Sequence, residues 1–333
     1  MANFFPMQTR PFDKSPTRVS EIGLGCWQLG GDWGDVSEDQ ALATLRAAAE
    51  AGVTFFDTAD VYGAGRSETL VGRFLKESRP NAFVATKLGR FSDPGWPANF
   101  TPAAMRGHTE ASLRRLGVEA LDLTQLHCVP TDVLRRGEVF DALREQKRAG
   151  LIRHFGASVE SMDEALLCLA QDGLSSLQII FNIFRQKPIA DLFEEAKRRN
   201  VSLIVRLPLA SGLLSGRMSR GTSFAASDHR TYNRDGQAFN VGETFAGLPF
   251  ETAVDLADGL KPFVPNGTTM AQMALRWCLD YDAVTTVIPG AKSPEQARAN
   301  AAAAALPPLG ASLHDRLGKY YRTSVASHIR GPY

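Results

Sequence analysis

Several polar side chains of this chain follow short apolar runs, at the places where buried strands would end. They are Asp57, Tyr62, Lys87 and His127. The runs are Val53–Asp57, Ala82–Lys87 and Leu121–His127, and the tyrosine follows in the loop after the first run. Because parallel strands present their carboxyl ends at one edge, the four side chains are expected to meet there.

The chemistry of these four residue types is mutually consistent. A free tyrosine has a pKa near 10, so it donates a proton at neutral pH only if a nearby cation stabilises its phenolate. Lys87 is placed to be that cation, and Asp57 to hold the buried ammonium. His127 would then hydrogen-bond a substrate carbonyl. We expect a site that gives a proton to an oxygen while another group delivers hydride to the adjacent carbon.

Apolar runs and helical patterns alternate about eight times, which predicts an α/β fold of parallel strands with crossover helices. Strands are expected near 21–26, 53–57, 82–87, 121–127, 152–157, 177–182, 201–206 and 284–288. Helices are expected near 38–51, 67–77, 101–116, 132–149, 161–171, 188–199, 268–280 and 293–304. Eight of each predict a (β/α)8 TIM barrel, and 333 residues suit one such domain over 1–333.

Signals at the helix starts support these boundaries. Thr101-Pro102 and Ser293-Pro294 each place a capping residue before a first-turn proline. The exception to the regular pattern is 211–250, a long segment rich in Gly, Ser, Asp and Asn after the seventh strand. A connection of this length is a functional loop or a disordered one. Two interpretations stay open: a lid over a bound ligand, or a surface insertion.

Composition narrows the possible partners. Thirty-seven basic residues against 36 acidic ones, with no dense basic run, make nucleic acid an unexpected partner. The cysteines are Cys26, Cys128, Cys168 and Cys278, too dispersed for a zinc or redox motif, so we expect buried thiols and no metal. Met1–Pro6 does not open a signal peptide and no long apolar stretch occurs, so we expect a cytoplasmic protein without a membrane partner.

Across nearly its whole length the chain resembles the aldo-keto reductase superfamily. The motifs that carry the resemblance are Gly23-Leu-Gly25, Asp57-Thr-Ala-Asp-Val-Tyr62-Gly followed by Ser67-Glu68, Thr86-Lys87, Leu126-His127 and Val287-Ile-Pro-Gly290. The resemblance implies a (β/α)8 barrel that binds an extended nicotinamide cofactor without a Rossmann fold. It also implies Tyr62 as general acid, Lys87 and Asp57 as its modulators, and His127 as the residue that positions the carbonyl.

The resemblance further implies cofactor contacts, with two departures. Ser158 and Gln178 match carboxamide-binding positions, but Val159 stands where the family usually has Asn. Arg206 stands at a position that is aromatic in many relatives; it is either a cofactor or substrate contact or a salt bridge in the barrel mouth. The remaining expected contacts are Leu209, Ser211, Leu213, Ser215 and Arg217 at the pyrophosphate, and Gly290, Lys292, Gln296 and Asn300 at the adenosine. Lys292 is placed for a 2′-phosphate, which favours NADP(H) and leaves NAD(H) possible.

These features predict an NADP(H)-dependent oxidoreductase that interconverts an aldehyde or ketone and its alcohol. The substrate would be a small molecule, with Trp27, Trp33 and Trp96 as possible walls of its site. Two other classes stay open: a cofactor-binding regulatory or partner subunit with little turnover, and a metal-dependent barrel isomerase or lyase. The sequence does not reveal the oligomeric state.

Overall fold

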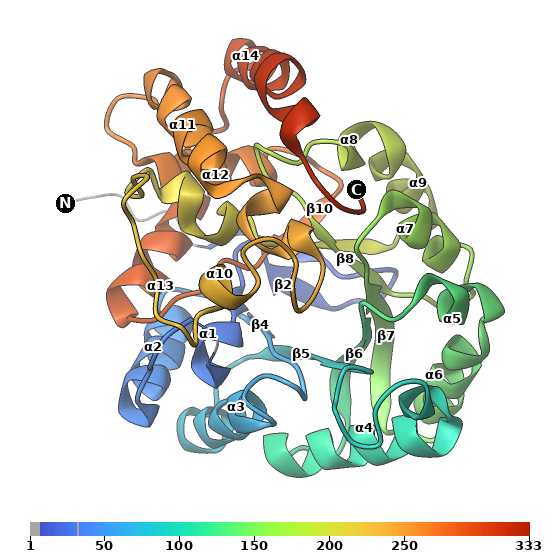
Figure 1. The fold of residues 1–333 in the computed structure, drawn as a ribbon. Helices are drawn as coiled ribbons and strands as arrows, with labels where there is room; N and C mark the ends of the chain where they lie inside the picture. Colours follow the sequence, from blue (N-terminus) through green and yellow to red (C-terminus); the bar gives the residue numbers. More distant parts are fainter. Residues whose placement is uncertain (1–6, 32) are drawn as a thin grey trace.

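The chain folds into a barrel of parallel strands surrounded by helices (Figure 1). The computed structural model describes residues 7–31 and 33–333, so Met1–Pro6 and the prediction made from it lie outside the described residues. The strands are β3 (Leu24–Gly25), β4 (Phe55–Asp57), β5 (Phe83–Leu88), β6 (Leu121–His127), β7 (Ile152–Ser158), β8 (Ser176–Ile180), β9 (Ser202–Arg206) and β10 (Val284–Val287). Each expected strand is therefore present.

The strands run in chain order from β3 to β10, and each pairs in parallel with the next. The last strand returns to the first through parallel bridges that join Ile22 to Val287 and Gly25 to Gly290. Backbone hydrogen bonds such as Gly23 N to Val287 O, at 2.8 Å, support this closure. The predicted (β/α)8 barrel is confirmed.

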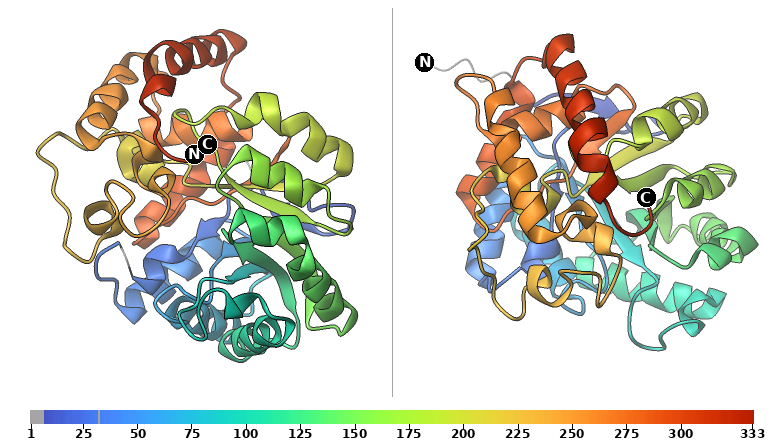
Figure 2. Two further views of the ribbon diagram at one scale, coloured as in Figure 1. Left: turned by 45° about the vertical axis from the view of Figure 1, so that its right-hand side comes forward. Right: turned by 45° about the horizontal axis from the view of Figure 1, so that its top comes forward.

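Most of the helices cover the outside of the barrel, as both views of Figure 2 show. The helices are α1 (Trp27–Gly30), α2 (Glu38–Glu50), α3 (Arg66–Ser78), α4 (Pro102–Leu116), α5 (Thr131–Arg136), α6 (Glu138–Arg148), α7 (Met162–Leu169), α8 (Pro188–Asp191), α9 (Phe193–Arg199), α10 (His229–Tyr232), α11 (Phe250–Gly259), α12 (Met270–Leu279), α13 (Pro294–Ala301) and α14 (Ala311–Tyr320). The short helices α1 and α10 lie instead at the mouth of the barrel. Among the described residues no helix has the length and apolar character that crossing a membrane requires.

Two of the predicted helices are wrong as single elements. The pattern over 132–149 is two helices, because Gly137 adopts a left-handed conformation with φ of 81° between α5 and α6. The pattern over 188–199 is likewise divided, at Leu192, into α8 and α9. In both cases the apolar periodicity continues across a local break in the backbone.

An antiparallel hairpin that the sequence pattern did not predict precedes the barrel. It consists of β1 (Thr9–Pro11) and β2 (Arg18–Ser20). Phe12, in its turn, is fully buried and lies in one apolar cluster with Phe55, Phe83, Leu123 and Ile204 from the strands. Because Phe55 and Phe83 are the first residues of β4 and β5, the hairpin closes the end of the barrel opposite the strands' carboxyl ends.

The segment 211–250 crosses the mouth of the barrel. It contains the 3-10 turns η2 (Ala210–Ser215), η3 (Val241–Glu243) and η4 (Phe245–Gly247), besides α10. Figure 1 draws α10 beside α1, and the rings of His229 and Trp27 have centroids 4.8 Å apart. Arg330, near the end of the chain, donates hydrogen bonds to Gly247 O and Asp235. The segment is therefore packed against α1 and against the C-terminal residues.

Candidate active site

Lys87 lies beneath the phenol of Tyr62 and is paired with Asp57. Lys87 Nζ is 2.5 Å from Asp57 Oδ1, 2.8 Å from Thr58 O and 3.3 Å from Tyr62 Oη. The lysine and aspartate side chains are 1% and 4% exposed, so this ion pair is almost free of solvent. Strand β4 ends at Asp57 and β5 ends one residue after Lys87, which explains why these side chains meet.

Burial and the charges of neighbouring side chains together determine the pKa values of Lys87 and Tyr62. Burial is the largest single effect and works against the charged ammonium of Lys87, but the combined interactions with Asp57 and Tyr62 outweigh it, so the pKa of Lys87 lies above its ordinary value. Burial raises the pKa of Tyr62 to about 12, although Lys87 opposes the rise. We expected the cation to dominate; in this structure desolvation of the phenolate is the larger effect. Tyr62 is therefore a protonated phenol over the neutral pH range.

His127 stands beside Tyr62 with its ring almost perpendicular to the phenol, at a centroid distance of 5.7 Å. Burial, reinforced by the cations Arg90 and Lys87, holds the pKa of His127 well below its ordinary value. The imidazole is thus neutral, with one N–H to donate and one nitrogen that accepts. Within 7–31 and 33–333 its Nδ1 atom has no hydrogen-bond partner.

These side chains adjoin a cavity of about 660 Å³, here called the main cavity. It brings together most of the residues singled out from the sequence. Those that line it are Trp27, Trp33, Asp57, Tyr62, His127, Ser158, Gln178, Arg206, Leu209, Ser211, Ser215, Arg217, Gly290, Lys292, Gln296 and Asn300. Residues that are more than 260 positions apart in the sequence thus line the same cavity.

Three expected site residues do not line this cavity. Leu213 is fully buried in the apolar core, so its expected contact with pyrophosphate would have to come from its backbone and stays a prediction. Lys87 lies behind Tyr62 and Asp57, which separate it from the main cavity. Trp96 lies in a neighbouring space of about 440 Å³, here called the side pocket, together with Trp27, Tyr62 and His127.

The carboxamide-binding candidates, Ser158 and Gln178, are linked by hydrogen bonds to the carboxylate of Asp57. Gln178 Nε2 donates to Asp57 Oδ2 at 2.7 Å, and Ser158 Oγ donates to Gln178 Oε1 at 3.5 Å. Both side chains are buried at the cavity wall. Val159 is buried and apolar, so it adds no side-chain hydrogen bond there. Asp57 is consequently held by both an ammonium and an amide.

Arg206 forms the salt bridge that was one of its two interpretations. Its Nη1 is 3.4 Å from Glu243 Oε1, and its Nη2 donates to Val159 O at 3.1 Å. The side chain is 11% exposed and also lines the main cavity. Contact with a cofactor or substrate therefore stays a prediction beside the ion pair.

The residues expected at the adenosine gather around the start of α13. Ser293 caps this helix by accepting from Gln296 N, and Gln296 Oε1 accepts from Lys292 N at 2.8 Å. Asn300 donates to Gly290 O at 3.2 Å. The helix N-terminus and the cations Arg217, Arg230 and Lys292, all facing the main cavity, suit an extended ligand that carries phosphates. The residues present thus fit a nicotinamide dinucleotide.

Some residues of the site gave no signal in the sequence. Glu243, from η3, faces both the main cavity and the side pocket, and it pairs with Arg90 as well as Arg206. Arg230 lies 4.9 Å from the ring of Trp33 and binds Asp228 through two nitrogens. Both come from 211–250, whose path across the barrel no local pattern specifies.

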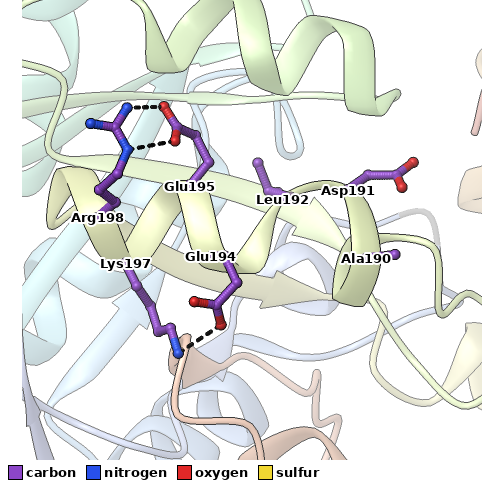
Figure 3. A pocket seen from close by; sticks show the side chains of 7 residues that line it. All are labelled: Ala190, Asp191, Leu192, Glu194, Glu195, Lys197 and Arg198. Atoms are coloured by element: carbon purple, nitrogen blue, oxygen red, sulfur yellow. Dashed lines mark hydrogen bonds and ion pairs between the residues drawn. The ribbon is translucent and has the colours of Figure 1, made fainter.

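Two other places in the structure are weaker candidates for a functional site. The hollow over α8 and α9 is lined by Glu194, Glu195, Lys197 and Arg198, which pair with one another at the surface (Figure 3). Cys128, Glu160 and Glu243 place possible metal-ligand atoms within 4.8 Å of one another. However, Arg90 and Arg206 already balance these carboxylates, which disfavours a divalent cation there.

Comparison with known proteins identifies the family. The model of the Aldo/keto reductase family matches residues 21–321. Aldo-keto reductase YhdN of Bacillus subtilis is 31% identical over 84% of each chain, and the NADH-specific methylglyoxal reductase of Escherichia coli is 28% identical over 89% of this chain and 93% of its own.

Solved structures give the same result. The holo form of an aldo-keto reductase from Bacillus halodurans superposes with a TM-score of 0.77, at 30% identity over 94% of this chain and 96% of the other. One from Klebsiella pneumoniae in complex with NADPH gives 0.69, at 25% identity over 95% and 96%. This chain is a barrel oxidoreductase. It belongs to the aldo/keto reductase family, whose members use nicotinamide cofactors.

Proposed function

We propose that this protein is an NADP(H)-dependent oxidoreductase that reduces an aldehyde or ketone to an alcohol, or catalyses the reverse. The observation that carries the proposal is the buried contact of Lys87 Nζ with both Tyr62 Oη and Asp57 Oδ1, at the wall of a cavity sized for a cofactor. A protonated phenol beside a neutral imidazole is suited to bind and protonate a carbonyl oxygen.

The roles of the residues follow from their hydrogen-bonding capacity. Tyr62 donates its proton to the carbonyl oxygen as the carbon gains a hydride and the C=O π bond becomes a C–O single bond. Lys87 donates to the phenol oxygen and so stabilises the phenolate that remains. His127, held neutral, donates a hydrogen bond to the same carbonyl oxygen and orients it. When bound, NAD(P)H supplies the hydride and is left as NAD(P)+.

The cofactor would lie along the main cavity. Ser158 and Gln178 would hold the carboxamide near Tyr62, with Arg206 against the ring. Leu209, Ser211, Ser215 and Arg217 would border the pyrophosphate through backbone or side-chain groups. Gly290, Gln296 and Asn300 would surround the adenosine.

Lys292 supports a preference for NADPH. Its side chain is at the cavity wall next to the start of α13, a position suited to a 2′-phosphate. Burial lowers the pKa of Lys292, and nearby Arg230 adds to this effect, so an added anion would be favoured there. The E. coli relative is named as NADH-specific, which makes the preference a point to measure.

The proposal also covers the cellular compartment of the protein and its domain organisation. The four cysteines are free and buried, which supports a reducing, cytoplasmic environment for a protein that acts on small molecules. We further propose that 1–333 forms one domain, because one contiguous apolar core extends from Ile22 to Val325.

Fluorescence titration with NADPH and, separately, NADH tests the proposal directly. NADPH binding at least about tenfold tighter than NADH binding, followed by oxidation of NADPH in a screen of aldehydes and ketones, is the expected result. Cofactor binding without turnover of any carbonyl would favour a regulatory or partner subunit. Absence of binding by either cofactor would contradict the proposed function.

A further inference from the structure

The side pocket adjoins the two groups that would hold the reacting carbonyl. Tyr62 and His127 are among its lining residues, and its volume of about 440 Å³ suits a small molecule. Aromatic side chains form much of its wall: Trp27, Phe91, Trp96, Tyr232 and Phe239. Arg90 and Glu243 supply the charged groups among the residues that line it. The pocket therefore combines aromatic walls with polar groups, and Arg90 and Glu243 form its charged corner.

Arg90 is loosely held in that corner. Its Nη1 is 3.5 Å from Glu243 Oε1, and its Nη2 is 3.5 Å from Glu160 Oε1. Charge-assisted hydrogen bonds normally measure 2.7–2.9 Å, so neither contact is a full one. A guanidinium has five N–H donors, and the side chain of Arg90 is 20% exposed. The guanidinium of Arg90 thus has N–H groups available to donate to a substrate oxygen that enters the side pocket.

The charged side chains around Arg90 disfavour the binding of an anionic substrate group. Arg90 and Arg206 are balanced by Glu160 and Glu243. A substrate carboxylate that approached Arg90 would also approach two protein carboxylates and would be repelled by them. A neutral oxygen avoids this repulsion, and if it carries a hydrogen it can also donate to Glu243. The corner therefore selects neutral polar groups over charged ones.

We propose that Arg90 and Glu243 form a subsite for a second, neutral oxygen on the substrate, next to the carbonyl held by Tyr62 and His127. The substrate class is then α-hydroxy ketones and aldehydes, vicinal dicarbonyls and, in the oxidative direction, vicinal diols. This inference rests on the proposed function and specifies the substrate of the same site. Arg90 follows Lys87 by three residues, so one strand end supplies both the cation beneath Tyr62 and the specificity group.

The subsite is tested by comparing alcohols of equal length with NADP+. In each oxidation the carbinol carbon gives a hydride to NADP+, and the hydroxyl proton passes to the phenolate form of Tyr62, which Lys87 stabilises. We expect kcat/KM for butane-2,3-diol to exceed that for butan-2-ol by about tenfold or more, because a site built for a hydroxyl rejects the analogue without it. In Arg90→Met this ratio should fall to within about threefold of unity.

A binding measurement adds a readout independent of turnover. Quenching of NADPH fluorescence in the enzyme–NADPH complex gives the dissociation constants of the two alcohols, and their ratio should fall in parallel in Arg90→Met. If Arg90→Met does not fold, Arg90→Lys replaces it in the test, since lysine keeps the positive charge but lacks the planar guanidinium with its several N–H donors. Arg136→Met, an exposed arginine on α5 with one carboxylate partner, is the matched control and should leave both ratios unchanged.

The outcomes separate the two proposals. An equal preference for diol and monool in the natural protein, or a preference that survives in Arg90→Met and Arg90→Lys, would overturn the subsite while the oxidoreductase function stands. Faster reduction of pyruvate than of hydroxyacetone would overturn the selection of a neutral group. If neither NADPH nor NADH binds, the proposed function fails and the subsite fails with it.

Discussion

Lys87 Nζ donates to Tyr62 Oη at 3.3 Å, and its other contacts, Asp57 Oδ1 and Thr58 O, occupy its remaining hydrogens. An ammonium has three donors and no acceptor, so its hydrogen bond with the phenol has a fixed direction. Because the phenol oxygen accepts from Lys87, the phenol hydrogen is left to point toward the cavity. The arrangement makes Tyr62 a donor toward a ligand.

Lys87→Met should leave the phenol of Tyr62 without this support. Burial would then oppose the phenolate unaided, so we expect kcat/KM to fall about 100-fold or more with little change in NADPH affinity. Steady-state rates and fluorescence titration measure the two effects. Lys76→Met, on the exposed face of α3, is the control. A pH–rate profile identical to that of the natural protein would argue against coupling between Lys87 and Tyr62.

Tyr62→Phe removes the proposed proton donor and keeps the ring. The ring lies parallel to Trp27 at a centroid distance of 5.8 Å, so packing should survive the change. We expect turnover to drop by roughly 100- to 10,000-fold, while NADPH still binds. Tyr320→Phe, whose hydroxyl donates to Leu256 O far from the cavity lining, should stay fully active. Retained turnover in Tyr62→Phe would remove the general-acid assignment.

Lys292→Ala tests the source of the expected cofactor preference. A lost contact with a 2′-phosphate should weaken NADPH binding by about tenfold or more and NADH binding much less. Titration of both cofactors gives the ratio directly. Lys319→Ala changes an exposed lysine of α14 and should alter neither affinity. Equal losses for the two cofactors would show that Lys292 does not recognise the 2′-phosphate.

Asp60 makes a prediction about stability. It lies between Asp57 and Tyr62 in sequence and is fully buried, and among the described residues no side chain hydrogen-bonds its carboxylate. Burial raises the pKa of Asp60 from 3.8 to about 7, and Glu68 adds to the rise. As pH increases from 4 to 7 the unfolded chain loses this proton first, so the contribution of Asp60 to folding stability decreases over that window.

Asp60→Asn should therefore be more stable than the natural protein at pH 8, by up to about 4 kcal/mol, and nearly equal to it at pH 4. Urea unfolding at both pH values measures the difference. Asp172→Asn, at an exposed position, should show no such dependence. A difference between Asp60→Asn and the natural protein that does not change with pH would mean that Asp60 keeps its ordinary acidity.

The sequence predicted most of the barrel because its signals are local. Thr101 and Ser293 accept from the backbone N–H groups of their helices, as capping residues before proline should, and the apolar runs end where the strands end. The interruption at Gly137 was missed because apolar spacing does not report a left-handed φ. The hairpin at Thr9–Ser20 was missed because its strands are short and its burial comes from the barrel.

The candidate site was predictable where strand ends determine it and unpredictable where the long segment does. Asp57, Lys87 and His127 follow from the ends of β4, β5 and β6. The position of Glu243 depends on long-range contacts: Ser211 Oγ donates to Glu243 O and accepts from Phe245 N, which joins the turns η3 and η4 to η2. Such contacts join residues over 30 positions apart without any periodic pattern.

The last prediction concerns that segment and the end of the chain. Arg330 Nε donates to Gly247 O at 2.9 Å and Nη1 to Asp235 at 2.8 Å, on either side of Glu243. Arg330→Ala should loosen 235–247, so we expect faster amide hydrogen exchange there and a KM for the carbonyl raised about threefold to tenfold. NADPH affinity should change less, because Glu243 lies at the substrate end.

Arg148→Ala is the control for this change, because Arg148 is largely exposed and its ion pair within the described part of the chain is with its helix neighbour Glu145. It should alter neither hydrogen exchange in 235–247 nor KM. If Arg330→Ala raised KM without faster exchange in the segment, the effect would come from the loss of positive charge. If neither quantity changed, the turns η3 and η4 would hold Glu243 in place through Ser211 alone, and the end of the chain would have no part in shaping the substrate site.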